Sequence, residues 1–269
     1  MVDALFGEPR LARVYDPLDP DRDDLVVYAA IAAEFGARSV LDIGCGTGTF
    51  ACLLAGRGLD VIGVDPAVAS LDVARAKPGA ERVRWLRCDA AGLPPLQVEL
   101  ATMTGNVAQV FLTDAEWGAV LRSARAALQP GGRLVFETRN PSAQAWREWN
   151  RAGSLSRAVV PGVGAVQSWS EMTGIQGDLV SFRSFFVFEA DGATLTSEST
   201  LRFRQRDEVA DSLMAAGFVV DDLRDAPDRP GRELVFVARR PGSAAIFAGD
   251  SRRRPAANPV YGSGLVGEQ

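Results

Sequence analysis

The fold of this chain is decided by one stretch near its amino terminus, Ser39-Val40-Leu41-Asp42-Ile43-Gly44-Cys45-Gly46-Thr47-Gly48-Thr49-Phe50. It begins with a short apolar run, which is typical of a buried parallel strand. Three glycines then alternate with other residues, and glycine permits positive φ and lets a ligand approach the backbone closely. Thr47 or Thr49 is expected to cap the helix that buries Phe50. The pattern predicts a strand, a tight turn and a helix, with a ligand bound at the helix amino terminus.

The spacing of the glycines separates two ligand classes. In the dinucleotide fingerprint the third glycine follows the second by three residues, whereas Gly48 follows Gly46 by two. An acid, Asp42, also stands two residues before Gly44. This pattern resembles motif I of the class I S-adenosylmethionine (SAM)-dependent methyltransferases. A tight turn that binds no ligand is the structural alternative.

A second apolar run ends in an acid. It covers residues 60–64, and Asp65 and Pro66 follow it. A carboxylate about 20 residues after the glycine turn is where the ribose hydroxyls of an adenosine cofactor are bound. Asp65 therefore supports an adenosine cofactor without choosing between NAD and SAM. It could also cap the helix expected over 67–76.

Two later features match the same family. Residues 82–88 alternate polar and apolar side chains, which predicts a strand, and Asp89 and Ala90 follow. In the methyltransferases an acid and a small residue at this strand end lie beside the adenine, although Asp89 could instead bond its own backbone in a turn. A helix over 114–128 then runs into the Leu-x-Pro-Gly-Gly sequence at 128–132, a methyltransferase landmark that leads into the fifth strand.

The fourth strand and its exit are expected over 98–111. The exit carries Thr104, Gly105 and Asn106, which resembles the Gly-Asn element of glycine/sarcosine N-methyltransferase-like enzymes. This strand neighbours the glycine-turn strand in a doubly wound sheet, so its exit faces the reactive end of a bound cofactor. Many methyltransferases carry an acid here and this chain does not. Catalysis is therefore expected to rest chiefly on proximity and alignment.

The resemblance implies an α/β fold: a doubly wound, Rossmann-like methyltransferase sheet of seven strands with a β-rich insertion after strand five. It implies SAM as cofactor, S-adenosylhomocysteine (SAH) as product and methyl transfer to nitrogen or oxygen of a small molecule. The implied cofactor contacts are Asp42, Gly44, Cys45, Gly46, Gly48, Asp65, Pro66, Asp89, Ala90, Thr104 and Asn106. The expected contributors to catalysis are Thr104, Asn106, Tyr15 and Arg139.

Composition narrows the function classes. The chain has 269 residues, 29 basic and 34 acidic side chains, a net charge of −5 and no histidine. The acidic balance argues against nucleic acid as a partner, and the absence of histidine removes the commonest general base and metal ligand. No metal site and no membrane span are expected. Three scattered cysteines fit a reducing cytoplasm. A homodimer is compatible with the sequence.

The chain is expected to divide into four parts. Residues 1–24 are expected to be irregular, because Pro9, Pro17 and Pro20 interrupt any long helix; with Tyr15 they could fold over the ligand as a lid. The other three parts are a SAM-binding core, a β-rich substrate insertion and a flexible tail, at 25–139 with 206–240, at 140–205 and at 241–269 respectively.

Finer expectations concern the flanks of the core. Asp23 or Asp24 is expected to cap a helix over 25–36. Residues 142–151 look helical, and strand-like runs follow at 157–160, 164–172, 179–189 and 193–205, with turns at Gly174, Gly177 and Gly192. The candidate pocket residues of the insertion are Trp146, Trp149, Trp169 and Arg183 besides Arg139, although the aromatic side chains could equally pack the insertion's own core.

Three other functions stay open on the sequence alone. The first is an NAD-dependent oxidoreductase, the second a protein or RNA methyltransferase, and the third a SAM-binding module without catalysis. The glycine spacing weakens the first, and the acidic charge weakens the RNA form of the second.

Overall fold

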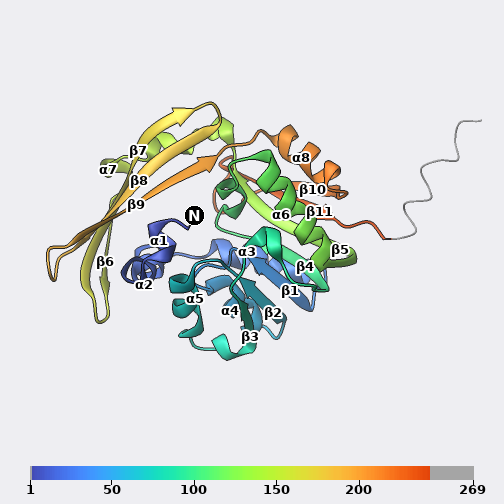
Figure 1. Ribbon diagram of the computed structural model, residues 1–269, viewed down its shortest axis with the longest axis horizontal. Helices are drawn as coiled ribbons and strands as arrows, with labels where there is room; N and C mark the ends of the chain where they lie inside the picture. Colours follow the sequence, from blue (N-terminus) through green and yellow to red (C-terminus); the bar gives the residue numbers. More distant parts are fainter. Residues whose placement is uncertain (1, 243–269) are drawn as a thin grey trace, which may run out of the picture.

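The computed structural model describes residues 2–242, which form two β-sheets and their surrounding helices (Figure 1). The main sheet has seven strands in the order β10-β11-β5-β4-β1-β2-β3. Its strands are β1 (Ser39–Ile43), β2 (Asp60–Val64), β3 (Val83–Leu86), β4 (Val98–Met103), β5 (Leu128–Arg139), β10 (Val219–Asp225) and β11 (Glu233–Arg239). The strands β1 to β5 run parallel, and β11 pairs antiparallel with β5 and β10. The expected doubly wound, Rossmann-like sheet is confirmed.

Alternating side chains bury both faces of this sheet. Leu41 and Ile43 of β1 belong to the apolar cluster on one face, and Val40, which precedes Leu41, belongs to the cluster on the other. The period of two is that of a strand covered by helices on both sides. The main helices around the sheet are α3 (Asp24–Glu34), α4 (Thr49–Gly56), α5 (Val68–Arg75), α6 (Asp114–Ala127) and α8 (Arg206–Ala215). Short 3₁₀ turns, η1 (Ala80–Arg82), η2 (Ala90–Gly92) and η3 (Val107–Val110), join several of these elements.

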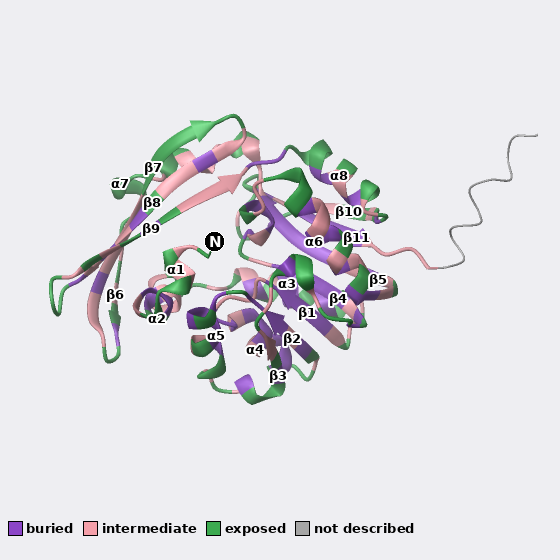
Figure 2. Ribbon diagram, in the orientation of Figure 1, coloured by how far each residue is buried: buried purple, intermediate pink, exposed green. Residues whose placement is uncertain are grey.

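A second, antiparallel sheet follows strand β5, as expected for the insertion. We call it the outer sheet; its strands are β6 (Ser156–Val160), β7 (Gly164–Gln176), β8 (Leu179–Phe188) and β9 (Thr194–Arg202), paired in that order. Figure 2 shows that its strands are mostly half-buried or exposed, whereas the central strands of the main sheet are buried. The outer sheet is therefore packed mainly through one face.

The amino-terminal segment corrects one sequence expectation. Residues 4–18 are not irregular but form α1 (Ala4–Gly7) and α2 (Pro9–Leu18), which lie between the outer sheet and the main sheet (Figure 1). Pro9 occupies the first position of α2, where no backbone donor is needed, and Pro17 stands in its last turn. Both prolines therefore bound a short helix, although they forbid a long one.

The α2 helix shares an apolar core with the outer sheet. This third core contains the buried side chains of Leu11, Val14, Val160, Val166, Phe186 and Phe188. Hydrogen bonds also join the amino-terminal segment to the outer sheet. The backbone N–H of Leu5 donates to Ser197 Oγ at 2.9 Å, and Ser156 Oγ donates to the carbonyl of Leu18 at 3.0 Å. We refer to α1, α2 and the outer sheet together as the outer layer.

Three smaller expectations are also corrected. The stretch 142–151 is not one helix, because Gln144 at φ 48° separates η4 (Pro141–Ala143) from η5 (Ala145–Glu148) before α7 (Arg151–Ser154). Gly174 lies inside β7 at a register shift rather than in a turn. The start of α3 has no side-chain cap: Asp23 is the N-cap residue and makes no capping bond, and Asp24, the first residue of the helix, pairs with Arg22.

The remaining strands and helices of the expected insertion and core lie close to where the sequence places them. The Leu128–Gly132 landmark forms the beginning of β5. Within residues 2–242 no helix has the length and apolarity that crossing a membrane requires. Most of the expected flexible tail, residues 243–269, lies outside the described residues.

Candidate functional site

The glycine turn connects β1 to α4 at the carboxyl edge of the main sheet. Gly44, Gly46 and Gly48 all adopt positive φ, at 71°, 51° and 78°. A Cβ on Gly44 would lie 2.6 Å from Val107, and a Cβ on Gly48 would lie 2.4 Å from Trp85. A Cβ on Gly46 would meet no atom within 4 Å. The outer two glycines thus permit packing, and Gly46 exposes bare backbone to open space.

The expected threonine cap of α4 is not made. Gly48 is the N-cap residue, and glycine has no side chain that could accept a capping hydrogen bond. The hydroxyls of Thr47 and Thr49 instead donate to Asp16 of α2, at 2.6 and 3.2 Å. Asp16 also pairs with Lys77 at 2.7 Å. We call these four residues the latch, since they tie the outer layer to the glycine turn.

Two carboxylates from neighbouring strand ends lie beside the turn. Asp65, after β2, accepts the N–H of Gly46 at 2.9 Å and the N–H of Ala67 at 2.8 Å. Burial raises the pKa of Asp65, although both backbone donors favour its charged form. Asp89, after β3, accepts the N–H of Ala91 at 2.8 Å, which is the turn bond that the sequence left open. Each carboxylate retains lone pairs that a ligand could use.

A cavity of about 1310 Å³ lies over this edge, between the main sheet and the outer layer. Among the sequence candidates, those that line it are Tyr15, Gly44, Cys45, Gly46, Asp65, Pro66, Asp89, Ala90 and Thr104. The outer layer contributes Phe6, Phe182, Arg183 and Ser199 to its walls, and Asp3, which precedes α1, lines it as well. The structure therefore brings most of the expected site residues around one space.

Four of the expected cofactor and catalytic residues lie outside the cavity lining: Asp42, Gly48, Asn106 and Arg139. Asp42 is 1% exposed beneath the glycine turn and accepts a hydrogen bond from Thr102 Oγ1 at 3.1 Å. Burial raises the pKa of Asp42 to about 7. Its second carboxylate oxygen has no protein partner.

Asn106 and Arg139 act behind the cavity wall. Asn106 has φ 62°, its N–H donates to Glu137 at 2.8 Å, and its side-chain amide donates to Glu233 at 3.0 Å. Arg139 donates to Gln109 Oε1 at 2.9 Å, and burial lowers the pKa of the guanidinium. The amide nitrogen of Asn106 and the guanidinium of Arg139 are thus engaged by protein groups, whereas Asn106 Oδ1 has no hydrogen-bond partner.

Tyr15 stands on α2 and borders the cavity. Its ring centroid lies 5.7 Å from that of Phe6, and burial raises the pKa of its phenol. At neutral pH the hydroxyl is therefore protonated and can donate a hydrogen bond.

Sequence reasoning missed four residues that shape the site. Arg22 lines the cavity and is paired with Asp24 at 3.1 Å. It was missed because it stands among several aspartates, and only those acids were considered in the sequence. Asp16 of the latch gave no signal in the sequence. Glu137 could have been found from the sequence. It directly follows an apolar run in β5, and a charged residue in such a run is expected to be buried with it. Glu233 opens β11 and gave no signal.

Of the candidate pocket residues in the insertion, Arg183 lines the cavity and the three tryptophans do not. Trp146 and Trp149 pack on Phe203, with ring centroids 4.6 and 6.0 Å apart. Trp169 stacks on Phe185 at 5.0 Å. These rings pack against aromatic side chains, which agrees with the alternative that they belong to the insertion's own core. Arg183 does line the cavity and pairs with Glu198.

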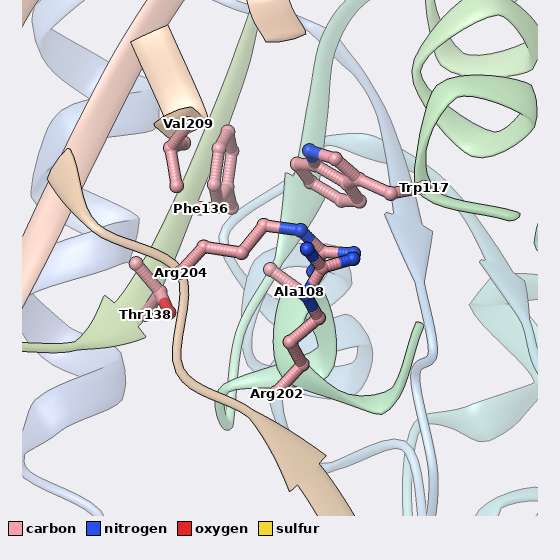
Figure 3. Close-up of a pocket in the computed structure, with 7 residues that line it drawn as sticks. All are labelled: Ala108, Trp117, Phe136, Thr138, Arg202, Arg204 and Val209. Carbon is pink, nitrogen blue, oxygen red and sulfur yellow. The ribbon is translucent and has the colours of Figure 1, made fainter. Parts of the chain in front are cut away.

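Two arginines hold one wall of the cavity from outside. Arg204 donates to the carbonyl of Phe111 at 2.7 Å, and Arg202 donates to the carbonyl of Leu112 at 3.1 Å. Figure 3 shows their guanidinium groups converging below Trp117 in a small separate pocket. Burial and the neighbouring charge of Arg202 lower the pKa of Arg204 to about 10. Phe111 and Leu112 line the main cavity.

Comparison with known sequences places this site in a family. A model described as a methyltransferase domain matches residues 40–132. The demethylmenaquinone methyltransferase of Deinococcus radiodurans is 30% identical over 243 residues, which cover 87% of this chain and 84% of that protein. The cypemycin N-terminal methyltransferase of a Streptomyces species is 31% identical over 136 residues, 50% of this chain and 54% of the relative. A ubiquinone biosynthesis O-methyltransferase of Acinetobacter baylyi is 31% identical over 114 residues, 41% of this chain and 48% of the relative. The chain thus spans about half the length of these last two relatives.

Solved structures share the fold. A SAM-dependent methyltransferase of Clostridium acetobutylicum superposes with a TM-score of 0.69 at 17% identity, covering 87% of this chain and 98% of that one. The SAM-bound amino pentose methyltransferase of calicheamicin biosynthesis from Micromonospora echinaspora gives a TM-score of 0.61 at 25% identity, covering 81% and 90%.

Proposed function

This chain belongs to the class I SAM-dependent methyltransferases, and we propose that it transfers the methyl group of SAM to a small-molecule acceptor bound in the large cavity. The observation that carries the proposal is the convergence of Gly46, Asp65 and Asp89 on one space. The open backbone of Gly46 has room for a ligand, and both carboxylates retain free acceptor positions. The NAD-dependent oxidoreductase is set aside, because the family cofactor is SAM.

The donor set fits the parts of SAM. We assign Asp65 to the ribose hydroxyls and Asp89 with Ala90 to the adenine, which repeats the sequence prediction. Gly44, Cys45 and Gly46 offer backbone to the methionine part, and Thr104 borders the reacting end. Arg22 adds a cation for the methionine carboxylate. Asp42 and Gly48 then support the turn from below, and Pro66 shapes the ribose wall.

The protein's part in the reaction is to align the acceptor and to exclude water. Bound SAM supplies a methyl group already activated by its positive sulfur. The outer layer covers the cavity, and the latch holds it against the glycine turn. Thr104 and Tyr15 can orient the acceptor by hydrogen bonds, whereas Asn106 and Arg139 act from behind the wall. Proximity and alignment then account for the catalysis.

The chain divides, in this proposal, as the sequence predicted. Residues 25–139 with 206–240 bind the cofactor, residues 140–205 cover the acceptor, and residues 1–24 form the lid. We also propose a cytoplasmic location, since Cys45, Cys52 and Cys88 are free thiols. The homodimer and the absence of nucleic acid as a partner stay predictions. The relatives act on unlike acceptors by their names, so none of those acceptors is carried over.

Titration calorimetry with SAM, SAH and NAD tests the cofactor. We expect micromolar binding of SAM and SAH and no binding of NAD. Incubation with SAM and a panel of small metabolites, followed by detection of SAH, then separates an enzyme from a SAM-binding module. Binding of NAD alone would overturn the proposal. Binding of SAM without SAH formation by any acceptor would favour the module.

A further inference from the structure

Three carboxylates lie buried together behind the exit of strand β4. Asp42 is the residue before the last in the neighbouring strand β1, Glu137 stands in β5 and Glu233 opens β11; they are 1%, 1% and 2% exposed. Each has one carboxylate oxygen without a hydrogen-bond partner. A buried, incompletely paired carboxylate is unfavourable for folding. Such groups are a common feature of functional sites, where perturbed pKa values gather.

Asn106 connects two of these acids to the cavity wall. Its N–H and its side-chain amide donate to Glu137 and Glu233, at 2.8 and 3.0 Å. The residues on both sides of it, Gly105 and Val107, line the cavity. Val107 also contacts the position where Gly44 lacks a Cβ. The two carboxylates therefore lie one residue behind the place where the glycine turn meets the strand-four exit.

Two guanidinium groups and one phenol lie near this pair. Glu233 forms an ion pair with Arg229 at 3.1 Å. The guanidinium of Arg139 is close enough to favour the charged form of Glu137, but its hydrogen bond goes to Gln109. Burial and the charge of Glu137 raise the pKa of Tyr28, which is packed from α3, so its phenol keeps its proton and favours the charged form of Glu137. Burial and Glu233 raise the pKa of Glu137 to about 7. A positive charge at the adjacent end of the cavity would stabilise the ionised pair.

We propose that Glu137 and Glu233 form an electrostatic element of the methyl-transfer site, which favours positive charge on the reacting atoms and therefore an amine as the methyl acceptor. This inference rests on the proposed function. It supplies, from β5 and β11, the negative charge that the exit of β4 lacks. Glu137 and Glu233 are positioning residues, since Asn106 stands between them and the cavity.

The reaction moves one positive charge toward the acceptor. The lone pair of a neutral amine nitrogen forms the new N–C bond, the S–C bond breaks, and its electron pair stays on sulfur. Sulfur becomes neutral, nitrogen becomes positive, and the extra proton leaves to solvent. The ionised pair favours both the starting sulfonium and the product ammonium. A hydroxyl acceptor would need a base in contact with it, and this pair lies behind the wall.

Three cofactor analogues test the charge preference without any acceptor. SAM carries a sulfonium, SAH a neutral thioether, and sinefungin a protonated amine where SAM carries its methyl. Glu137→Gln keeps an oxygen that can accept from Asn106 and removes the charge. We expect calorimetric titration to show about fivefold weaker binding of SAM and sinefungin to this variant, and an SAH affinity within about twofold of wild type.

Matched variants complete the test. Glu99→Gln changes the same residue type in the same sheet, but at the opposite strand end, where Glu99 accepts the N–H groups of Arg38 and Ser39; it should leave all three affinities unchanged. Glu233→Gln should repeat the selective loss, and it decides the matter if Glu137→Gln fails to fold. Equal weakening of all three ligands, or no change, would overturn the inference. Failure of wild type to bind SAM and SAH would instead overturn the proposed function.

Discussion

The carboxyl edge of the main sheet and the outer layer build the two sides of one cavity in different ways. At the edge, Gly46 and Asp65 come from adjacent parallel strands and are joined by a backbone hydrogen bond of 2.9 Å. In the outer layer, Leu5 and Ser197 are joined across 192 residues of sequence. The edge is built from short turns, which leave a recognisable motif in the sequence. The outer layer is made by side-chain packing between distant segments, which leaves no local pattern.

This difference explains what the sequence could predict. The glycine spacing, the acid after β2 and the Pro-Gly-Gly sequence are required by backbone geometry, and they predicted the sheet and most of the residues that line the cavity at its carboxyl edge. Proline rules predicted an irregular amino terminus, which was wrong because Pro9 starts a helix and Pro17 ends it. The apolar core that holds α2 against β8 depends on Leu11 and Phe188, which are ordinary apolar residues in the sequence.

The same reasoning applies within the edge. A strand pattern shows that Asn106 follows β4, but it does not show which way the side chain turns. The positive φ of Asn106 and the two carboxylates behind it are settled by packing against β5 and β11. The sequence therefore predicted a cofactor role for Asn106, while the structure directs its side chain away from the cavity.

The strongest test of the comparison concerns Gly46. Gly46→Leu would project a side chain into the open space of the cavity, so we expect SAM affinity to fall by at least about 100-fold, while the fold is retained. Circular dichroism and calorimetry measure the two effects. Gly79→Leu is the control: Gly79 also has positive φ, at 81°, and open space, but lies before η1, away from the cavity. If Gly46→Leu binds SAM with wild-type affinity, the carboxyl edge of the main sheet is not part of the SAM site.

A core truncation asks whether the outer layer folds as a separate unit. Phe188 is fully buried between α2 and the outer sheet, so Phe188→Ala should destabilise that layer by about 3 kcal/mol. Hydrogen exchange should then rise at amides of α2 and β8 while β1 and β4 stay protected. Phe236→Ala in the main core is the matched change. It should raise exchange in both layers, and an identical pattern from the two variants would contradict separate units.

A pH-dependent test contrasts an acid of the edge with an acid of the outer layer. Burial raises the pKa of Asp42 to about 7 in the folded protein. Between about pH 4 and pH 7 the folded protein keeps the Asp42 proton that the unfolded chain has already released. The stability that protonated Asp42 contributes below about pH 4 is therefore lost as the pH rises to about 7. Asp42→Asn should stabilise the protein by about 2 kcal/mol at pH 8 and by little at pH 4.

Urea unfolding at the two pH values measures this difference. Glu189 is the control in the outer layer, because it is paired with Arg157 at 2.9 Å on the surface. Glu189→Gln should leave the stability at both pH values close to that of the wild type, because solvent screens an exposed ion pair. A stability gain for Asp42→Asn that is the same at pH 4 and pH 8 would show that the charge of Asp42 is not its cause.

The latch joins the two regions, and its removal should have the smallest effect. Asp16→Ala removes the acceptor of Thr47 and Thr49 and the partner of Lys77, the one lysine of the chain. The core of α2 with β8 remains, so the outer layer should stay folded but open more often over the glycine turn. We expect SAM affinity to fall by about tenfold, mainly through faster dissociation.

Stopped-flow displacement of SAM by excess SAH measures that dissociation rate. Asp72→Ala is the matched control, because Asp72 is an exposed acid of α5 whose pair with Arg75 contacts neither the glycine turn nor α2. It should leave the rate unchanged. If Asp16→Ala also leaves it unchanged, the outer layer is held to the edge by its remaining contacts alone, and the side of the cavity that lacks a motif would be as firmly fixed as the side that has one.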